Sequence, residues 1–409
     1  MSQHVLVIGA SLGGLRLAEQ LRALGHHGPV TVAGAESHMP YNRPPLSKTV
    51  LTGAGDRIEV MKAIGFRLRS GLDDVRWKLG AAAVAADLDR RFVTFSDGER
   101  IAYDAMAIAT GLSPRRLALA GGEMDRFVLR TVDDALALRT RLVPGVRLVV
   151  IGGGFVGCEV AASAAMLGAS VTIVESLAAP MQRAIGLAAG RAMQELHANE
   201  GVSFRLRATV QDFVENDHGR LIGIRLEGGE ILACDIALEA LGSMPNTSWL
   251  DGNGLDLEDG VLCDNRMCVE GRPDVVACGD IARFPNPFAD AVPRRIEHWS
   301  VPALTARRAA ESLLGHFTGA VVGADAFAPL PSFWSDQHGV RLQSYGAPSL
   351  GEESQVLEGS LAADDLRKDG AAIGWRRHNR LIGVVLIGLK PTRLGVYRDL
   401  VEGARNMLN

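Results

Sequence analysis

One pattern occurs twice in this chain: a short apolar strand, a glycine-rich loop, a helix, a second strand and an acidic residue. In the second copy the strand RLVVI (147–151) leads into GGGFVG (152–157), a helix through residue 167, the strand VTIV and then Glu175. This is the order of a dinucleotide-binding βαβ unit, in which glycines let the backbone approach a pyrophosphate and the helix N-terminus offers free N–H groups. The acidic residue, about 20 positions further on, accepts hydrogen bonds from ribose hydroxyls.

The first copy departs from the pattern at one position. A strand at 4–8 is followed by GASLGG (9–14), a helix to about residue 24, a strand at 30–33 and Glu36, so that Ser11 replaces the middle glycine. Taken alone, this copy could equally be a structural glycine turn. Two units in one chain imply two dinucleotides, and the economical pairing is a flavin held permanently and a nicotinamide that visits, because the flavin stores the electrons that a hydride donor gives up.

A third strand indicates which unit binds which ligand. Residues 274–284, DVVACGDIARF, read as a short strand ending at Gly279-Asp280. Alone this could be an ordinary strand-end turn. In flavoproteins with two dinucleotides, however, such a strand closes the FAD domain and places its aspartate on the ribityl chain. The first unit then belongs to the FAD domain, and ATG (109–111) and GSMPN (242–246) lie where the chain leaves that domain and returns to it.

Composition excludes several other classes of protein. The 409 residues suggest two or three domains, and the net charge of −4 supplies no overall field for nucleic acid or anionic lipid. There is no run of about 18 or more apolar residues that could span a membrane. The five cysteines form no C-x-x-C and follow no secretory signal, which favours a reducing cytoplasm.

Several further motifs identify the family that the chain resembles. They are PYNRPPLSK (40–48), ATG, GGGFVGCEVAASA, the Pro-Asn of GSMPN, CGDIARF, EHW (297–299) and PSFWSDQHG (331–339). In this order they resemble the NADH-dependent ferredoxin and rubredoxin reductases of bacterial oxygenase systems, the putidaredoxin-reductase-like flavoproteins. The resemblance implies that electrons pass from NADH through FAD to a 2Fe-2S ferredoxin, which feeds a monooxygenase or dioxygenase. It leaves open whether the chain is a monomer or a homodimer.

The same resemblance implies an α/β fold of the glutathione-reductase-like plan, with two Rossmann-like dinucleotide-binding domains and a C-terminal αβ domain. The expected boundaries are 1–112 with 245–322 for FAD, 113–244 for NADH, and 323–409 for the C-terminal domain.

PYNRPPLSK raises a question of its own, because its three prolines stiffen a segment that presents Arg43 and Lys48. Each proline fixes its own φ and pushes the preceding residue toward extended geometry, so the segment alone reads as a rigid surface loop. The family resemblance gives it another meaning: Lys48 lies by the flavin ring and pairs with Glu159. In a partly dry pocket such a pair would keep both groups charged and favour negative charge on a reduced flavin.

The resemblance also implies the remaining site residues. Trp299 and Trp334 could be core filler, or could stack on the nicotinamide or flavin and mark the electron's exit. His298 alone reads as a packed histidine, and no metal site is expected. The residues expected to act in catalysis are Lys48, Glu159, Trp299 and Trp334; those expected to bind FAD are Gly9, Ser11, Gly13, Gly14, Glu36, Arg43, Lys48, Thr110, Gly111, Asp280, Glu297, His298 and Trp299; and those expected to bind NADH are Gly152, Gly154, Gly157, Glu159, Glu175 and Gly242.

Two departures from the family pattern bear on the flavin site. Asn42 stands where the family usually has aspartate, and EHW is followed by SVPALTA (300–306). Pro302 is expected to disturb the start of the helix that lies over the flavin's pyrimidine end, because proline removes a backbone donor.

Other functions fit the sequence less well. Disulfide reductases carry a cysteine pair after the first acidic residue, but 37–60 contains no cysteine, and Cys263 and Cys268 lie instead just before the CGD strand. The same absence argues against NADH oxidases that use a thiol facing the flavin. A binding or signalling flavoprotein, like the apoptosis-inducing-factor relatives, would need a basic surface if it acted on nucleic acid. The chain instead has local basic clusters, which are either solvated faces or a docking patch for an acidic ferredoxin; among them are Arg294-Arg295, Arg307-Arg308 and Arg376-Arg377.

Overall fold

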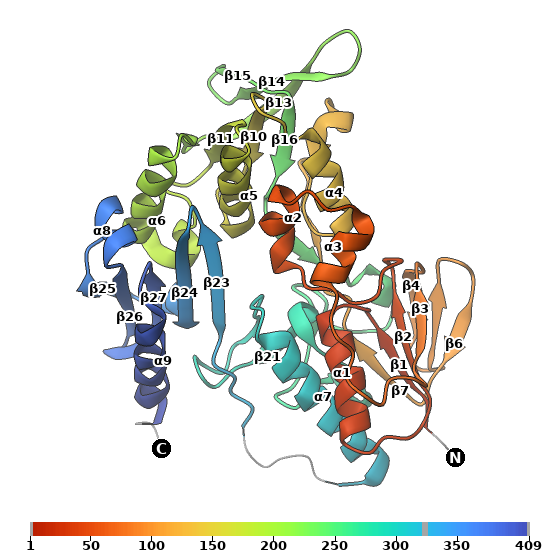
Figure 1. Ribbon diagram of the computed structural model, residues 1–409. Helices are drawn as coiled ribbons and strands as arrows, with labels where there is room; N and C mark the ends of the chain where they lie inside the picture. Colours follow the sequence, from red (N-terminus) through yellow and green to blue (C-terminus); the bar gives the residue numbers. More distant parts are fainter. Residues whose placement is uncertain (1–2, 321–325, 407–409) are drawn as a thin grey trace. The chain divides into compact units, whose positions relative to one another are not determined.

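The computed structural model describes residues 3–320 and 326–406 (Figure 1). The chain divides into two compact units. The first unit consists of Met1–Asn42, Met61–Ser113 and Met244–Ser332, and the second of Arg43–Val60, Pro114–Ser243 and Phe333–Asn409. The division into three domains stays a prediction, and its boundary at 322/323 lies outside the described residues.

The first unit is built on a six-stranded sheet in the order β19-β20-β7-β1-β2-β3. The strands from β20 to β3 are parallel, and only β19 runs antiparallel to its neighbour. Strands β1 and β7 are buried along their whole length, as expected for parallel strands covered on both faces. The bounds are β1 Val5–Ile8, β2 Val30–Gly34, β3 Arg76–Leu79, β7 Ala105–Ile108, β19 Cys268–Val269 and β20 Arg272–Ala277.

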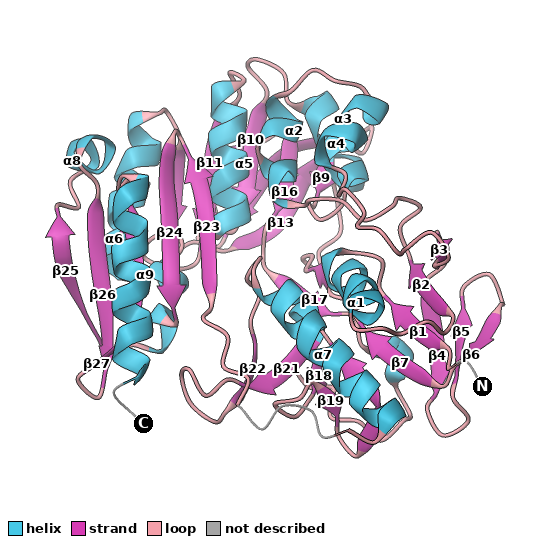
Figure 2. Ribbon diagram, turned by 60° about the horizontal axis from the view of Figure 1, so that its bottom comes forward, coloured by secondary structure: helices cyan, strands magenta, loops and turns pink. Residues whose placement is uncertain are grey.

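Two helices of the first unit pack against each other: α1 (Leu12–Ala23) follows β1, and α7 (Val301–Thr318) also contacts β20 (Figure 2). Their buried faces join the strands in one apolar core. Two small sheets complete the unit. One contains β4 Ala83–Asp87, β5 Phe92–Phe95 and β6 Arg100–Ala102, and the other contains β18 Val261–Leu262, β21 Ala282–Pro285 and β22 Pro293–Arg295.

The second unit repeats the parallel plan with a five-stranded sheet in the order β12-β11-β10-β16-β9. Helix α5 (Phe155–Met166) follows β10 and packs on β10 and β11. The strands of this sheet are β9 Arg126–Phe127, β10 Arg147–Ile151, β11 Ser170–Glu175, β12 Ser203–Leu206 and β16 Ile236–Glu239. This part of the unit also contains the helices α2 Thr49–Thr52, α4 Val132–Arg141 and α6 Gln182–Asn199. The strands β13 Val210–Glu215, β14 Leu221–Leu226 and β15 Ile231–Ala233 form a small antiparallel sheet.

The C-terminal part of the second unit is an antiparallel sheet in the order β23-β24-β27-β26-β25, with α9 packed on β24 and β27. The bounds are β23 Ser332–Gln337, β24 Val340–Gly346, β25 Glu353–Gly359, β26 Ala371–Arg377, β27 Arg380–Ile387, α8 Ala363–Lys368 and α9 Pro391–Asn406. The α-helix and the strands not yet named are α3 Arg57–Ile64, β8 Leu112–Pro114 and β17 Ser243–Pro245. In the described part of the chain, no helix is long and apolar enough to cross a membrane.

The sequence predicted the fold class correctly, with two βαβ units in the expected places, but two local expectations were wrong. Pro302 does not disturb its helix: α7 begins at Val301 and takes Pro302 into its first turn, where a backbone N–H has no partner within the helix in any case. Arg43 is not extended before Pro44, but has helical φ and ψ of −79° and −35°. Its guanidinium donates a 2.6 Å hydrogen bond to the carbonyl of Arg130, a long-range contact that sequence spacing does not reveal.

Candidate active site

The glycines in the loop of the second unit, residues 152–157, differ in how much space surrounds them. Gly152 has a φ of +104°, and a Cβ there would overlap the carbonyl oxygen of Ala240, while a Cβ at Gly157 would overlap that of Gly152. Gly152 therefore lets the chain after β10 approach the residue after β16, and Gly157 lets the first turn of α5 approach the end of β10. At Gly154, the N-cap of α5, a Cβ would meet no described atom within 4 Å. The middle glycine therefore borders open space at a helix N-terminus, where a phosphate group would be stabilised.

The first unit reproduces this geometry. Gly9 has a φ of +126°, and a Cβ there would overlap the carbonyl oxygen of Ala109, while a Cβ at Gly14 would overlap that of Gly9. Ser11 is the N-cap of α1, as Gly154 is of α5. Because the corresponding position is open in the other copy, a small side chain fits there. Ser11, which stands where the motif has its middle glycine, therefore leaves the backbone of the first loop unchanged. Both loops fit a dinucleotide pyrophosphate.

An acidic side chain lies at the end of the second strand or just beyond it in each unit. Glu175 ends β11, and its two carboxylate oxygens accept 2.8 Å hydrogen bonds from the N–H groups of Gly153 and Leu177. The carboxylate is thereby fixed beside the glycine loop. Glu36 lies two residues beyond β2 and accepts a 2.5 Å hydrogen bond from the Tyr41 hydroxyl.

The Gly-Asp motif lies just beyond β20, from which it is separated by Cys278, and the sequence had predicted a strand that ends at this motif. Gly279 has a φ of +77° and donates its N–H to Thr305 Oγ1 on α7 at 3.0 Å. The Asp280 carbonyl accepts a 3.3 Å hydrogen bond from Arg295, whose guanidinium also pairs with Glu297 at 2.8 Å. The backbone at 279 and 280 is therefore tied both to the helix that packs on α1 and to the EHW segment.

The two segments at the expected crossover are also held in place. Thr110 Oγ1 donates to the Asn246 carbonyl, and Asn246 Nδ2 donates to the Thr110 carbonyl, both at 2.9 Å. Gly111 and Gly242 have φ values of +62° and +85°, which glycine adopts without strain. The Gly242 carbonyl accepts the N–H of Arg115.

The two candidate tryptophans are half-buried. Trp299 stacks on Phe66, with ring centroids 6.1 Å apart and an interplanar angle of 24°. Trp334 has the Arg341 guanidinium 5.6 Å from its ring centroid. Burial lowers the pKa of His298 to about 4, so this ring is neutral near pH 7, as a packed histidine would be.

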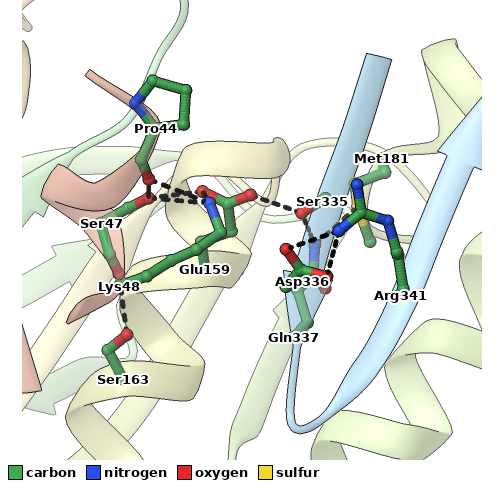
Figure 3. A network of polar contacts seen from close by, with 10 residues as sticks. All are labelled: Pro44, Ser47, Lys48, Glu159, Ser163, Met181, Ser335, Asp336, Gln337 and Arg341. Atoms are coloured by element: carbon green, nitrogen blue, oxygen red, sulfur yellow. Dashed lines mark hydrogen bonds and ion pairs between the residues drawn. The ribbon is translucent and has the colours of Figure 1, made fainter. Parts of the chain in front are cut away.

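Lys48 and Glu159 form an ion pair within the second unit, with 2.6 Å between Lys48 Nζ and Glu159 Oε2 (Figure 3). The side chain of Glu159 is 8 % exposed and that of Lys48 20 %, so the pair is largely shielded from water. Pro44 contributes to the pair, because its carbonyl accepts a 3.2 Å hydrogen bond from the same Nζ. The proline-rich segment forms a short 3₁₀ turn, Pro44–Ser47, that delivers Lys48 to the carboxylate.

Three serines complete this cluster, and sequence reasoning missed all of them. Ser47 Oγ donates to Glu159 Oε2 at 2.5 Å, and Ser335 Oγ donates to Glu159 Oε1 at 2.6 Å (Figure 3). Ser163, one turn after Glu159 on α5, donates to the Ser47 carbonyl at 2.7 Å and ties the 3₁₀ turn to the helix. A signal was available, because Ser47 lies in PPLSK and Ser335 lies in FWSDQ, two of the motifs that carried the family resemblance.

The five cysteines are free thiols, and four of them are buried. Burial raises the pKa of Cys234 and Cys278 to about 12 and raises those of Cys158, Cys263 and Cys268 as well. A thiol is nucleophilic only as a thiolate, so these are packed side chains and not redox groups. Among the residues that the structure describes, no three His, Cys, Asp or Glu side chains are grouped as a metal site would require.

The arginine pairs considered for partner docking have carboxylate neighbours. Arg294 pairs with Asp290 at 2.5 Å, Arg295 with Asp259 at 2.8 Å and Arg307 with Glu311 at 3.0 Å. Their local positive field is therefore smaller than a count of arginines suggests.

Comparison with known proteins yields one consistent family. Residues 3–305 match the model of the family described as pyridine nucleotide-disulphide oxidoreductase. The chain is 34 % identical to the ferredoxin reductase component of chlorobenzene dioxygenase from Cupriavidus sp. (strain PS12), over 98 % of this chain and 93 % of the relative. It is 32 % identical to a rubredoxin-NAD(+) reductase from Ectopseudomonas oleovorans, over 84 % and 86 %. Its fold matches the crystal structure of the covalent putidaredoxin reductase-putidaredoxin complex with a TM-score of 0.88 at 28 % identity, over 99 % of this chain and 93 % of that chain.

Proposed function

The chain belongs to the pyridine nucleotide-disulphide oxidoreductase family, and we propose that it is the FAD-dependent NADH:ferredoxin reductase of an oxygenase system. It takes electrons from NADH and passes them to a 2Fe-2S ferredoxin or a rubredoxin. The free cysteines, together with relatives that serve dioxygenases, support a place in the cytoplasm.

The observation that carries this proposal is the matched geometry of the two glycine loops. In both, the outer glycines are required by backbone contacts, and the position between them is the N-cap of the following helix. Strand β1, which precedes the first loop, lies in the same sheet as β20, which leads to Gly279-Asp280, and this supports the assignment of the first loop to FAD. The second loop, with Glu175 fixed beside it, is assigned to NADH. A carboxylate beside this loop accepts hydrogen bonds from the ribose hydroxyls of NADH and repels the 2′-phosphate of NADPH.

When bound, FAD accepts two electrons together from NADH and releases them one at a time. Lys48 supplies a positive charge for this chemistry in a site largely shielded from water, where a preorganised charge has the greatest effect. Glu159 keeps the ammonium group in one position, since the carboxylate is itself fixed by Ser47 and Ser335. Trp299 and Trp334 are proposed to lie near the nicotinamide and flavin rings or on the electron's exit path.

The class of electron acceptor is inferred from the cysteines, because no reactive thiol lies in the segment expected near the flavin. Segment 37–60 contains no cysteine, and the five thiols elsewhere are held protonated by burial. Disulfide reduction would require a reactive thiol pair, so a one-electron protein acceptor is favoured.

NADH-driven reduction of cytochrome c tests the proposal. The FAD-loaded protein is measured alone and with a panel of 2Fe-2S ferredoxins and rubredoxins. We expect cytochrome c reduction to depend on one of these partners and to exceed NADH oxidation by air. The proposal is wrong if air oxidises NADH as fast as the whole panel does, or if a disulfide substrate is reduced faster than any partner.

A further inference from the structure

A line of polar side chains extends from Glu159 into the C-terminal sheet of the second unit. Ser335 Oγ lies 2.6 Å from Glu159 Oε1, and Gln337 Nε2 lies 2.9 Å from Ser335 Oγ. His197 Nε2 lies 2.8 Å from Gln337 Oε1, and His338 Nε2 lies 2.9 Å from His197 Nδ1. Ser335 and His197 are 0 % exposed and Gln337 is 1 % exposed, so water does not compete for these hydrogen bonds.

The chemistry of the groups gives this line one direction. An ionised carboxylate only accepts hydrogen bonds, so the Ser335 hydroxyl donates to Glu159 and accepts from Gln337. The Gln337 amide is oriented by a second contact, since its Nε2 also lies 3.4 Å from Met181 Sδ, a weak acceptor (Figure 3). The amide oxygen therefore faces His197, and His197 must carry its proton on Nε2. Its Nδ1 is then free to accept from His338.

Both histidines are neutral near pH 7, as this direction of the hydrogen bonds requires. Burial lowers the pKa of His197 and of His338 to about 4, so near neutral pH each ring is neutral and carries one N–H. A charged His197 would bear a proton on Nδ1 and could not accept from His338. The charged groups beside the outer end are Arg367, which donates to the His338 carbonyl at 3.2 Å, and Glu200, which pairs with Arg367 at 2.5 Å.

We propose that Ser335, Gln337 and His197 are positioning residues that hold the Glu159 carboxylate in the orientation in which it pairs with Lys48. The inference rests on the proposed function, in which that pair supports reduction of the flavin by NADH. Four consecutive donors point toward one carboxylate, and each hydrogen bond polarises the next in a buried, low-dielectric environment. Strand β23 with the turn after it and the helices α5 and α6, which are far apart in the chain, thereby fix the position of one charged pair.

A pair of matched serine variants tests the role of the line. Ser335→Ala removes the donor to Glu159, and Ser344→Ala removes another fully buried serine of the same sheet, whose hydroxyl has no hydrogen-bond partner among the described residues. In stopped flow with NADH we expect Ser335→Ala to reduce its flavin about tenfold more slowly, the loss of one hydrogen bond to a charged group. Ser344→Ala should match the parent protein, and Ser335→Thr, which keeps the hydroxyl, should recover most of the rate. Equal rates for the two alanine variants at equal FAD content overturn the proposal.

The tautomer of His197 provides a readout that does not depend on activity. In ¹⁵N-histidine-labelled protein, with His197→Gln to assign the signal, we expect the neutral Nε2–H form between pH 6 and 8. An Nδ1–H tautomer would reverse the line and an imidazolium in this range would break it at His338, so either result would refute the inference. Failure of the proposed function has a different signature: the parent protein would show no reduction of FAD by NADH, and the tautomer would still decide the direction of the line.

Discussion

Replacing Lys48 with methionine separates the structural role of the lysine from its chemical role. Breaking a buried ion pair by removing one partner typically costs 3 to 5 kcal/mol, roughly, because the other charge is left unpaired. Here the cost is smaller, since the Lys48 side chain is 20 % exposed and Glu159 keeps its hydrogen bonds from Ser47 and Ser335. We therefore expect Lys48→Met to lower the free energy of unfolding by about 2 kcal/mol. Urea titration monitored by tryptophan fluorescence measures this loss.

The kinetic effect of Lys48→Met should be larger than the structural one. Removing one preorganised charge or donor from an active site costs about 100-fold or more in rate. In stopped flow we expect flavin reduction by NADH to slow by about this factor while FAD stays bound. The double variant Lys48→Met/Glu159→Gln should recover part of the stability, because no buried charge remains, but not the rate. If Lys48→Met reduces its flavin at the parent rate, PYNRPPLSK is only a rigid structural segment and the proposed role of the pair is wrong.

Three further predictions concern the dinucleotides and the partner. A Cβ at residue 157 would overlap the Gly152 carbonyl oxygen, so Gly157→Ala should lower the thermal midpoint of unfolding. Gly154 borders open space, so Gly154→Ala should chiefly raise the KM for NADH. Similar stability losses in the two variants would contradict this. Because Glu175 lies fixed beside the loop, kcat/KM should favour NADH over NADPH by about tenfold or more, and comparable values for the two nucleotides would refute the assignment. The rate with an acidic ferredoxin should fall as salt rises from low to physiological strength, where the Debye length is about 8 Å. Since Arg294 and Arg295 are already paired with carboxylates, we expect a modest decrease, and a rate independent of salt would exclude electrostatic docking.

The dinucleotide units could be predicted because their signals are local. A strand, a loop with glycines at fixed spacing and a helix occur within about 30 residues, and the positive φ values at Gly9 and Gly152 follow from the turn that joins strand to helix. The fold class and the positions of both loops were therefore readable from one sequence. Even Ser11, which weakened the first motif, left the backbone of its loop unchanged.

The surroundings of Lys48 depend on contacts between distant segments. Glu159 lies 111 residues after Lys48 and was identified only through the family resemblance, while Ser335 lies 176 residues after Glu159 and was not identified at all. No periodicity links such positions, because hydrogen bonds between side chains of different elements depend on how those elements pack. The same limit explains the error at Arg43, where a hydrogen bond to the distant Arg130 carbonyl accompanies helical geometry that its neighbour Pro44 disfavours.

The sequence alone thus determined where the chain can bind two dinucleotides, since backbone geometry at a glycine loop is set within a few residues. Only the tertiary structure decided how the charged pair is held. The direction of the line from His338 to Glu159 arises from two histidines, an amide and a hydroxyl that α6 and residues 335–338 bring within hydrogen-bonding distance. Each of these residue types can both donate and accept hydrogen bonds, so its role is undefined until burial removes water and leaves it a fixed set of partners.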